Sequence, residues 1–191
     1  KNDPSWMGRM EYEYNLAAKE CGIEVPESRL FESQTSDGYF ASKRFDRKEG
    51  KRVHVLSLSA LLEIPHDLPL LDYVSFLQAT LFITQSQKEV EKAFRLACFN
   101  VFSKNYDDHS KNFAFLYDLE KGGYVLSPAY DLTRTIHQKE HEMTCVGKAL
   151  PNEDDLFLLA KKMNIPSLKA KNILFLVKNV VESRLKEWIQ K

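Results

Sequence analysis

The stretch NYDDHSKN, residues 105–112, places two Asp, one His, one Lys and two Asn within eight positions, directly after a long apolar segment. Asp107 precedes Asn112 by five residues. A carboxylate can orient a weak hydroxyl nucleophile and accept its proton, and an amide oxygen a turn away can hold the metal ion that neutralises phosphate charge. The types and spacing of these two residues therefore predict phosphoryl-transfer chemistry.

A further acidic residue follows in the segment SPAYDLT, where Asp131 could supply a second metal ligand. The protein-kinase catalytic loop has the same Asp-to-Asn spacing, and a separate Asp of those enzymes binds magnesium. Taken alone, an Asp and an Asn five residues apart are common, and a polar loop that caps two helices explains them equally well. The combination of a buried helix before the cluster, the cluster itself, a hairpin and then Tyr130 and Asp131 favours the catalytic interpretation.

A buried helix is expected to position this cluster. In QKEVEKAFRLACFNVFSKN, apolar residues recur at offsets of three and four, which predicts a buried helical face made of Val90, Ala93, Phe94, Ala97, Cys98 and Val101. Other large apolar residues fill the remaining faces, so this helix is expected to be central. It should end near Asn105 and deliver the polar cluster from a rigid support.

The elements after the cluster can also be predicted. FAFLYD and GYVLSPAYD flank Gly122 and Gly123 and predict a short hairpin that leads to Asp131. Two helices should follow, NEDDLFLLAKKM with Asn152 as its N-cap and SLKAKNILFLVKNVVESRLKEWIQK capped by Ser167.

The segments before the central helix are shorter. A helix is predicted over residues 10–21, with Gly22 as its C-cap. Two strands joined by a turn at Asp37 and Gly38 should follow. The polar KEGK then leads into VHVLSLSALLEIPHDLP, which predicts a short strand or the start of a helix ending at Pro65.

Four of these segments together resemble the HipA-type serine/threonine kinases, the toxins of bacterial toxin–antitoxin modules. The family patterns N-x-D-x-H-x-K-N-F and P-x-Y-D-L appear as NYDDHSKNF and PAYDL, in the same order. EYEYNLAAKECGIEVP resembles the family's first helix, and ASKRFDR resembles its hinge motif. The resemblance implies an α+β, protein-kinase-like fold, with part of an N-lobe and the hinge in residues 1–47 and a mainly helical C-lobe in residues 48–191.

The resemblance also implies roles in the binding of ATP and Mg²⁺. Asp107 would be the catalytic base, and Asn112 and Asp131 would be the magnesium ligands. His109 and Lys111, which lie between base and metal ligand, would contact phosphate or the transferring group, although a loop His and Lys are often only structural or solvated.

The adenine site is implied by the same resemblance. The strand around residues 43–45 would be the hinge, where backbone groups from Lys43 to Phe45 read the adenine edge whatever the side chain is. Asp46 would bind a ribose hydroxyl. The family often has an acidic residue at the position of Lys43, so only a backbone role is expected there.

The chain departs from the family pattern before its first helix, because it has no Gly-rich loop and no phosphate-binding lysine there. Three explanations are open: the chain is a fragment, the corresponding strands are disordered, or a separate polypeptide carries this part of the N-lobe. The alternative to an active kinase is therefore a partial, non-catalytic lobe that binds an antitoxin or a separate N-lobe polypeptide.

The resemblance implies partners as well: a protein substrate in translation, such as an aminoacyl-tRNA synthetase, and a DNA-binding antitoxin. Composition gives no global reason for direct binding to nucleic acid or membranes, because 27 Lys and Arg balance 27 Asp and Glu among 191 residues. The apolar stretches are too short and too interrupted for a membrane span. Three widely spaced cysteines predict no disulfide framework and fit a reducing cytoplasm.

A zinc site is a weaker hypothesis for one further segment. His137, His141 and Cys145 are spaced four residues apart, which would align them on one face of a helix. The β-prone sequence MTCVGKAL argues against a regular helix at this position, and a solvated loop or strand pair is favoured instead.

Overall fold

The structure is a computed structural model that describes residues 4–64 and 71–190. Its α-helices are α1 (Met7–Glu20), α2 (Leu58–Leu61), α3 (Tyr73–Thr84), α4 (Gln87–Ser103), α5 (Glu153–Lys162), α6 (Ser167–Arg184) and α7 (Lys186–Ile189). Its strands are β1 (Ser28–Phe31), β2 (Tyr39–Ser42), β3 (Arg47–Lys48), β4 (Lys51–Arg52), β5 (Val55–Ser57), β6 (Ala114–Asp118) and β7 (Gly123–Leu126). The expected α+β class is confirmed.

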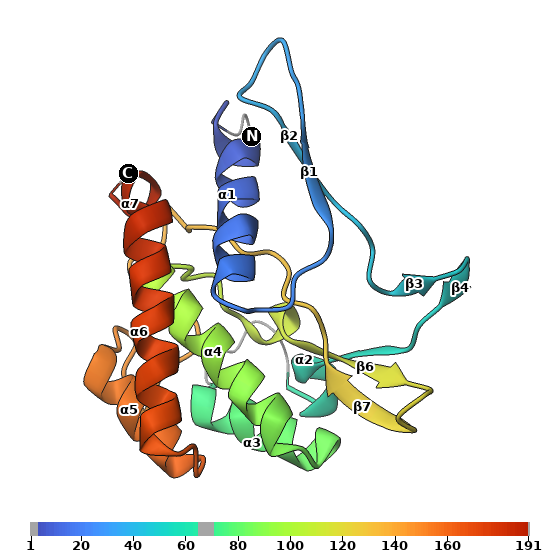
Figure 1. Cartoon of the computed structure of the whole chain (residues 1–191), viewed down its shortest axis with the longest axis vertical. Helices are drawn as coiled ribbons and strands as arrows, with labels where there is room; N and C mark the ends of the chain where they lie inside the picture. Colours follow the sequence, from blue (N-terminus) through green and yellow to red (C-terminus); the bar gives the residue numbers. More distant parts are fainter. Residues whose placement is uncertain (1–3, 65–70, 191) are drawn as a thin grey trace.

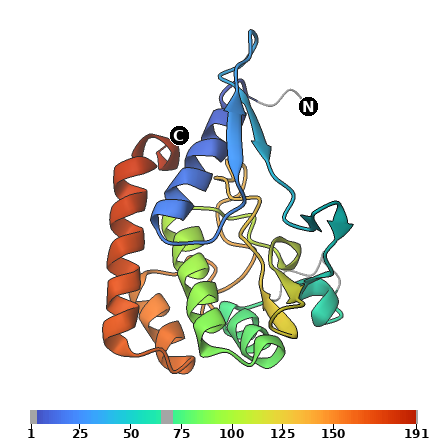
Figure 2. The same ribbon diagram turned by 45° about the vertical axis from the view of Figure 1, so that its right-hand side comes forward.

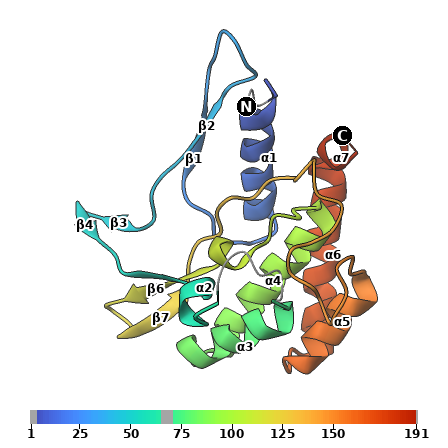
Figure 3. The ribbon, with the colours of Figure 1, turned by 180° about the vertical axis from the view of Figure 1, so that it is seen from behind.

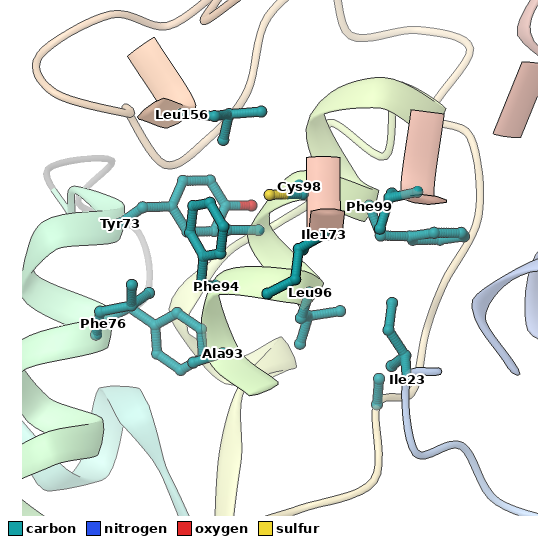
Figure 4. Close-up of a cluster of buried hydrophobic side chains, with 14 of the residues drawn as sticks. Ile23, Tyr73, Phe76, Ala93, Phe94, Leu96, Cys98, Phe99, Leu156 and Ile173 are labelled. Atoms are coloured by element: carbon teal, nitrogen blue, oxygen red, sulfur yellow. The ribbon is translucent and has the colours of Figure 1, made fainter. Parts of the chain in front are cut away.

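Helix α4 is central, as its sequence predicts. It lies between α3 and α6, and Figure 2 shows the three helices side by side. Apolar side chains from α4 meet those of α3, α5 and α6, and Figure 4 shows Phe94 and Cys98 between Tyr73, Leu156 and Ile173. Burial of this apolar surface on several sides makes α4 a rigid support for the loop that follows it.

The first helix is bound to the helical part of the molecule. Helix α1 runs beside α6 (Figure 1). The buried Tyr14 hydroxyl donates to the backbone oxygen of Ser103 at 2.6 Å, and Arg184 of α6 pairs with Glu13 at 3.2 Å and with Glu20. The division into a partial N-lobe, residues 1–47, and a C-lobe, residues 48–191, stays a prediction. The contacts of Tyr14, Glu13 and Glu20 join these two parts of the chain.

Strands β1 and β2 form the predicted antiparallel hairpin, which extends beside α1 (Figure 1). The connection spans residues 32–38, so Asp37 and Gly38 end a longer loop instead of forming the whole turn. A side chain at Gly8 would overlap the backbone oxygen of Gly38. Glycine is therefore required where α1 meets this loop.

A second small hairpin, β3–β4, forms around the polar KEGK segment, for which the sequence analysis predicts no element. Arg47 pairs with Arg52, and Lys48 with Lys51. The two turn residues, Glu49 and Gly50, have φ angles of 51° and 76°. Positive φ at both central positions is typical of a type I′ hairpin turn. The residues of the two strands are all charged, so no alternation of apolar and polar residues predicts these strands.

Strands β5, β6 and β7 form a three-stranded antiparallel sheet beside α2 (Figure 3). The hairpin predicted around Gly122 and Gly123 is confirmed. The segment before Pro65 forms both alternatives that its sequence allows, strand β5 and then helix α2, whose N-cap Ser57 accepts from the backbone N–H of Ala60. Pro65 itself lies outside the described residues.

The two predicted caps of the last helices have different outcomes. Asn152 caps α5 in a full capping box with Asp155, as predicted. The prediction for Ser167 is wrong, because Ser167 is already helical, Pro166 occupies the N-cap position and no side-chain cap is formed. A boundary shift of one residue is common at helix ends.

Two general predictions concern the whole chain. Cys21, Cys98 and Cys145 are free and buried, in agreement with the absence of a disulfide framework. Among the described residues, no helix is both long enough and apolar enough to cross a membrane.

Candidate active site

The polar cluster lies between the end of α4 and the sheet. Lys104 ends α4 in the left-handed conformation, and a short 3₁₀ turn at residues 110–112 precedes β6. The Asn112 amide nitrogen donates to the backbone oxygen of Asp107 at 2.8 Å, and the Asp107 N–H donates to Thr135 Oγ1 at 3.0 Å. The backbone of Asp107 is thus fixed on both sides.

The hydrogen bond between Asn112 and Asp107 also orients the Asn112 amide. Because the nitrogen faces the backbone of Asp107, the oxygen Oδ1 faces away from it and accepts no hydrogen bond from the described part of the chain. An amide oxygen is a suitable ligand for a hard cation such as Mg²⁺.

Three ionisable side chains, those of Asp107, His109 and Asp131, interact electrostatically with one another. His109 Nε2 lies 3.7 Å from Asp107 Oδ1, and the Asp107 side chain remains 45% exposed. The Asp131 carboxyl is partly desolvated, which raises its pKa, and the nearby Asp107 charge raises it further while His109 lowers it. The structure therefore brings Asp107, His109 and Asp131 within electrostatic reach of one another.

Tyr130 connects Asp131 to the loop of residues 105–112 and to the predicted hinge segment. Its hydroxyl donates to the backbone oxygen of Lys111 at 2.5 Å, and its ring centroid lies 5.4 Å from that of Phe45. Burial, and then the Asp131 charge, raise the pKa of Tyr130 to about 12, so the hydroxyl keeps its proton. Asp131 follows with φ at 53°, a left-handed conformation that is uncommon outside glycine.

The hinge segment differs from the sequence prediction in one respect. Strand β2 ends at Ser42, so Lys43 and Phe45 follow the strand instead of lying in it. The Lys43 N–H is already used, since it donates to the backbone oxygen of Glu27 at 2.8 Å. The backbone N–H groups of Arg44 and Phe45 donate to no group in the described residues, so they are the ones available to a ligand.

Asp46 is close to the hinge but its carboxylate is engaged. Arg44 donates to both of its oxygens, at 2.8 and 2.6 Å, and Arg47 donates to one at 2.6 Å. These contacts, chiefly the hydrogen bonds from Arg44, lower the pKa of Asp46 to about 2. A ribose hydroxyl would have to displace or share these arginines.

The two remaining predicted residues are placed differently. The Lys111 side chain is exposed and contacts no partner in the described chain. His109 is less exposed, and its Nδ1 atom is buried without a hydrogen-bond partner in that same part of the molecule. His109 therefore faces the site more closely than Lys111 does.

Asp108 was missed by the sequence reasoning. It is fully buried and accepts four hydrogen bonds, which come from the Tyr73 hydroxyl, His141 Nδ1 and the backbone N–H groups of Glu142 and Met143. The doublet Asp107-Asp108 was the only sequence signal, and it does not say which carboxylate points inward.

The zinc hypothesis gains no support from this geometry. His141 Nδ1 is occupied by Asp108 at 2.8 Å, and the Cys145 sulfur lies 3.9 Å from the backbone oxygen of Asp155. Within residues 4–64 and 71–190, no group of three His, Cys, Asp or Glu side chains could hold a metal ion.

The fold resembles those of two solved proteins. One is HipA of Shewanella oneidensis MR-1, solved as a toxin–antitoxin complex with HipB and operator DNA, with a TM-score of 0.74, 16% identity, and coverage of 96% of this chain and 49% of HipA. The other is the Helicobacter pylori proinflammatory kinase CtkA, with a TM-score of 0.62, 15% identity, and coverage of 98% of this chain and 84% of CtkA. These likenesses define a kinase-like fold.

The family follows from the sequence. The model of the HipA-like C-terminal domain matches residues 2–188, so the chain belongs to the HipA-like C-terminal domain family, as its motifs predicted. A comparison with curated proteins found no match. The chain spans about half of the length of the Shewanella HipA, 49% of that protein.

Proposed function

We propose that this chain carries the catalytic machinery of an ATP- and Mg²⁺-dependent serine/threonine protein kinase of the HipA type. The observation that supports this most is the joint arrangement of Asp107, Asn112 and Asp131. The Asp107 carboxylate is accessible, and the Asn112 amide oxygen accepts no hydrogen bond from the described residues. The Asp131 carboxylate lies close enough to Asp107 for the two charges to interact. A kinase needs these three groups for its base and its metal site.

Asp107 would accept the proton of the substrate hydroxyl. Its side chain is accessible, and the hydrogen bonds to Thr135 and Asn112 hold its backbone, so little reorganisation would be needed when a substrate binds. His109, 3.7 Å away, would contact the transferring phosphoryl group, and Lys111 would reach phosphate from the surface.

Asn112 and Asp131 would hold Mg²⁺. Both offer hard oxygen ligands of the kind that Mg²⁺ prefers. When bound, the ion would neutralise the β- and γ-phosphate charge. The protein contributes the position of these oxygens, through Tyr130 on one side and the backbone of Asp107 on the other.

The hinge segment would bind the adenine. The unpaired N–H groups of Arg44 and Phe45 are available for the base edge, and the Phe45 ring offers an apolar contact. Lys43 would contribute its backbone oxygen only, since its N–H is used. Asp46 would bind the ribose if Arg44 and Arg47 yield one carboxylate oxygen.

Membership of the family supports a proposal for the substrate and the partners. We propose a toxin that phosphorylates a translation component such as an aminoacyl-tRNA synthetase in the cytoplasm. A DNA-binding antitoxin would restrain it, by analogy with the HipB and operator DNA of the Shewanella complex. A separate polypeptide that carries the phosphate-binding loop would be a further partner.

One observation favours a second candidate, a non-catalytic lobe that binds an antitoxin or a separate N-lobe polypeptide. The carboxylate of Asp46 is bound by Arg44 and Arg47 instead of being open to a ribose. In that case the hinge would be closed by its own ion pairs, and the chain would bind protein without using ATP.

A phosphoryl-transfer assay separates the two candidates. The intact protein is incubated with γ-labelled ATP and Mg²⁺, alone and with purified aminoacyl-tRNA synthetases, beside the Asp107→Asn variant. A kinase labels itself or a synthetase, and Asp107→Asn abolishes the label. Absence of label with every acceptor, together with antitoxin binding that Asp107→Asn leaves unchanged, would support the binding module.

A further inference from the structure

The most completely buried acid in the described chain lies one residue after the proposed base. The Asp108 side chain has no exposed surface, and that of His141, which it contacts, is 2% exposed. A buried carboxylate is costly unless several donors satisfy it. Asp108 Oδ1 accepts hydrogen bonds from the backbone N–H groups of Glu142 at 2.9 Å and Met143 at 3.2 Å. Oδ2 accepts hydrogen bonds from the Tyr73 hydroxyl at 2.6 Å and from His141 Nδ1 at 2.8 Å.

These contacts decide which way the neighbouring side chains point. Burial alternates along this part of the loop: Asp108 and Ser110 are buried, whereas Asp107 and His109 are partly exposed. In an extended chain, successive side chains point to opposite sides. With Asp108 anchored in the core, Asp107 and His109 must share the outer side, where their side chains are 3.7 Å apart.

The anchor is itself fixed by two helices. The Tyr73 hydroxyl of α3 accepts a hydrogen bond from the side-chain amide nitrogen of Asn100 in α4 at 3.1 Å. The amide oxygen of Asn100 accepts a hydrogen bond from the amide nitrogen of Asn105, also at 3.1 Å. Burial, reinforced by the Asp108 charge, raises the pKa of Tyr73 well above its ordinary value, so its hydroxyl stays protonated and remains a donor. The network therefore joins α3, α4, the catalytic loop and residues 141–143.

We propose that Asp108, held by Tyr73 and His141, is the positioning residue that directs Asp107 toward the substrate hydroxyl. This inference rests on the proposed function, because it assigns Asp108 a task in catalysis only if Asp107 is the base. Asp108 does not touch substrate. It acts by preventing the loop from rotating, which would exchange the inner and outer carboxylates.

The variant Tyr73→Phe tests this with little change in shape. It removes one donor to Asp108 and keeps the ring that fills the core. Thr80→Val is a matched control, since Thr80 lies on the same helix, is fully buried, and donates its hydroxyl to the backbone oxygen of Phe76 at 2.8 Å. Asp108→Asn is the second variant, which keeps the size of the side chain but loses two acceptor contacts.

Two readouts are measured on the intact protein. The first is MgATP turnover, followed as ADP release, with kcat and KM separated. The second is amide hydrogen exchange at Asp107, whose N–H is bonded to Thr135. Tyr73→Phe should lower kcat about 10- to 100-fold with KM for MgATP nearly unchanged, and should speed exchange at Asp107 by about tenfold. Thr80→Val should change neither.

The outcomes distinguish this inference from the proposed function. If the wild type releases no ADP, the kinase proposal fails, and exchange at Asp107 alone decides whether Asp108 positions the loop. Equal effects of Tyr73→Phe and Thr80→Val on exchange overturn the positioning role, whatever happens to kcat. If Tyr73→Phe does not fold, Asp108→Asn takes its place: it should lower kcat and speed exchange at Asp107 in the same way. An effect on exchange equal to that of Thr80→Val would then overturn the positioning role.

Discussion

The adjacent residues Asp107 and Asp108 allow a sharp test, because they have the same side chain in opposite environments. We compare Asp107→Ala with Asp108→Ala. Asp108 accepts four hydrogen bonds without any contact with solvent, whereas the Asp107 carboxyl is 45% exposed and lies 3.7 Å from His109. The first change should remove activity and keep stability, and the second should remove stability.

The size of the difference follows from these contacts. Asp108→Ala leaves a buried hydroxyl, a buried imidazole and two backbone N–H groups without their acceptor. Breaking a buried charged network of this kind by removing one partner costs about 3–5 kcal/mol. Asp107→Ala removes a partly solvated carboxyl, so its effect on the free energy of unfolding should stay within about 0.5 kcal/mol.

Urea denaturation, followed by far-UV circular dichroism, measures both free energies of unfolding. The midpoint of Asp108→Ala should fall well below that of the wild type, with a similar slope, and that of Asp107→Ala should not move. Equal midpoints for the two variants would refute the assignment of the inner and outer carboxylates. A larger loss in Asp107→Ala would show that the two residues are interchanged.

Three further predictions concern other parts of the site and fold. Because Arg44 is the main cause of the low pKa of Asp46, the ion pair should persist down to about pH 2 and break as the pH falls through that value. Titration of the Asp46 carboxyl followed by NMR should show its pKa rising toward 3.8 in Arg44→Gln and rising less in Arg47→Gln. An unchanged titration in Arg44→Gln would contradict this. Asn152→Ala should lower the free energy of unfolding by about 1 kcal/mol in urea, whereas a loss well under that value would show that the capping box contributes little. Asp131→Asn should keep or raise the melting temperature without Mg²⁺, because it removes a charge that desolvation and Asp107 disfavour, and a lower melting temperature would contradict that repulsion.

Much of the architecture could be predicted because its signals are periodic or local. The apolar repeat of α4 indicates a helix buried on most sides, and the Gly122 and Gly123 pair indicates the β6–β7 hairpin. The β3–β4 hairpin was missed because its strands are charged and exposed on both faces, so only the Glu49-Gly50 turn could have revealed it.

In the candidate site, too, the features with a local sequence signal could be predicted and the others could not. Local spacing suffices to propose Asp107 and Asn112, since one loop carries both. The role of Asp108 depends on Tyr73 and His141, which are 35 and 33 residues away, and a single sequence has no signal for contacts at that separation. The pairing of Asp46 with Arg44 and Arg47 was also missed, because a run of neighbouring charges does not by itself show which side chains pair.

Calorimetric titration of ATP into the intact protein, with and without Mg²⁺, tests whether Asn112 and Asp131 form a magnesium-dependent ATP site. The wild type is compared with Asp131→Ala, which removes one proposed metal ligand and leaves the hinge unchanged. We expect binding that requires Mg²⁺ and weakens at least about tenfold in Asp131→Ala. Binding that is equal in the two proteins and independent of Mg²⁺, or no binding to either, would contradict it.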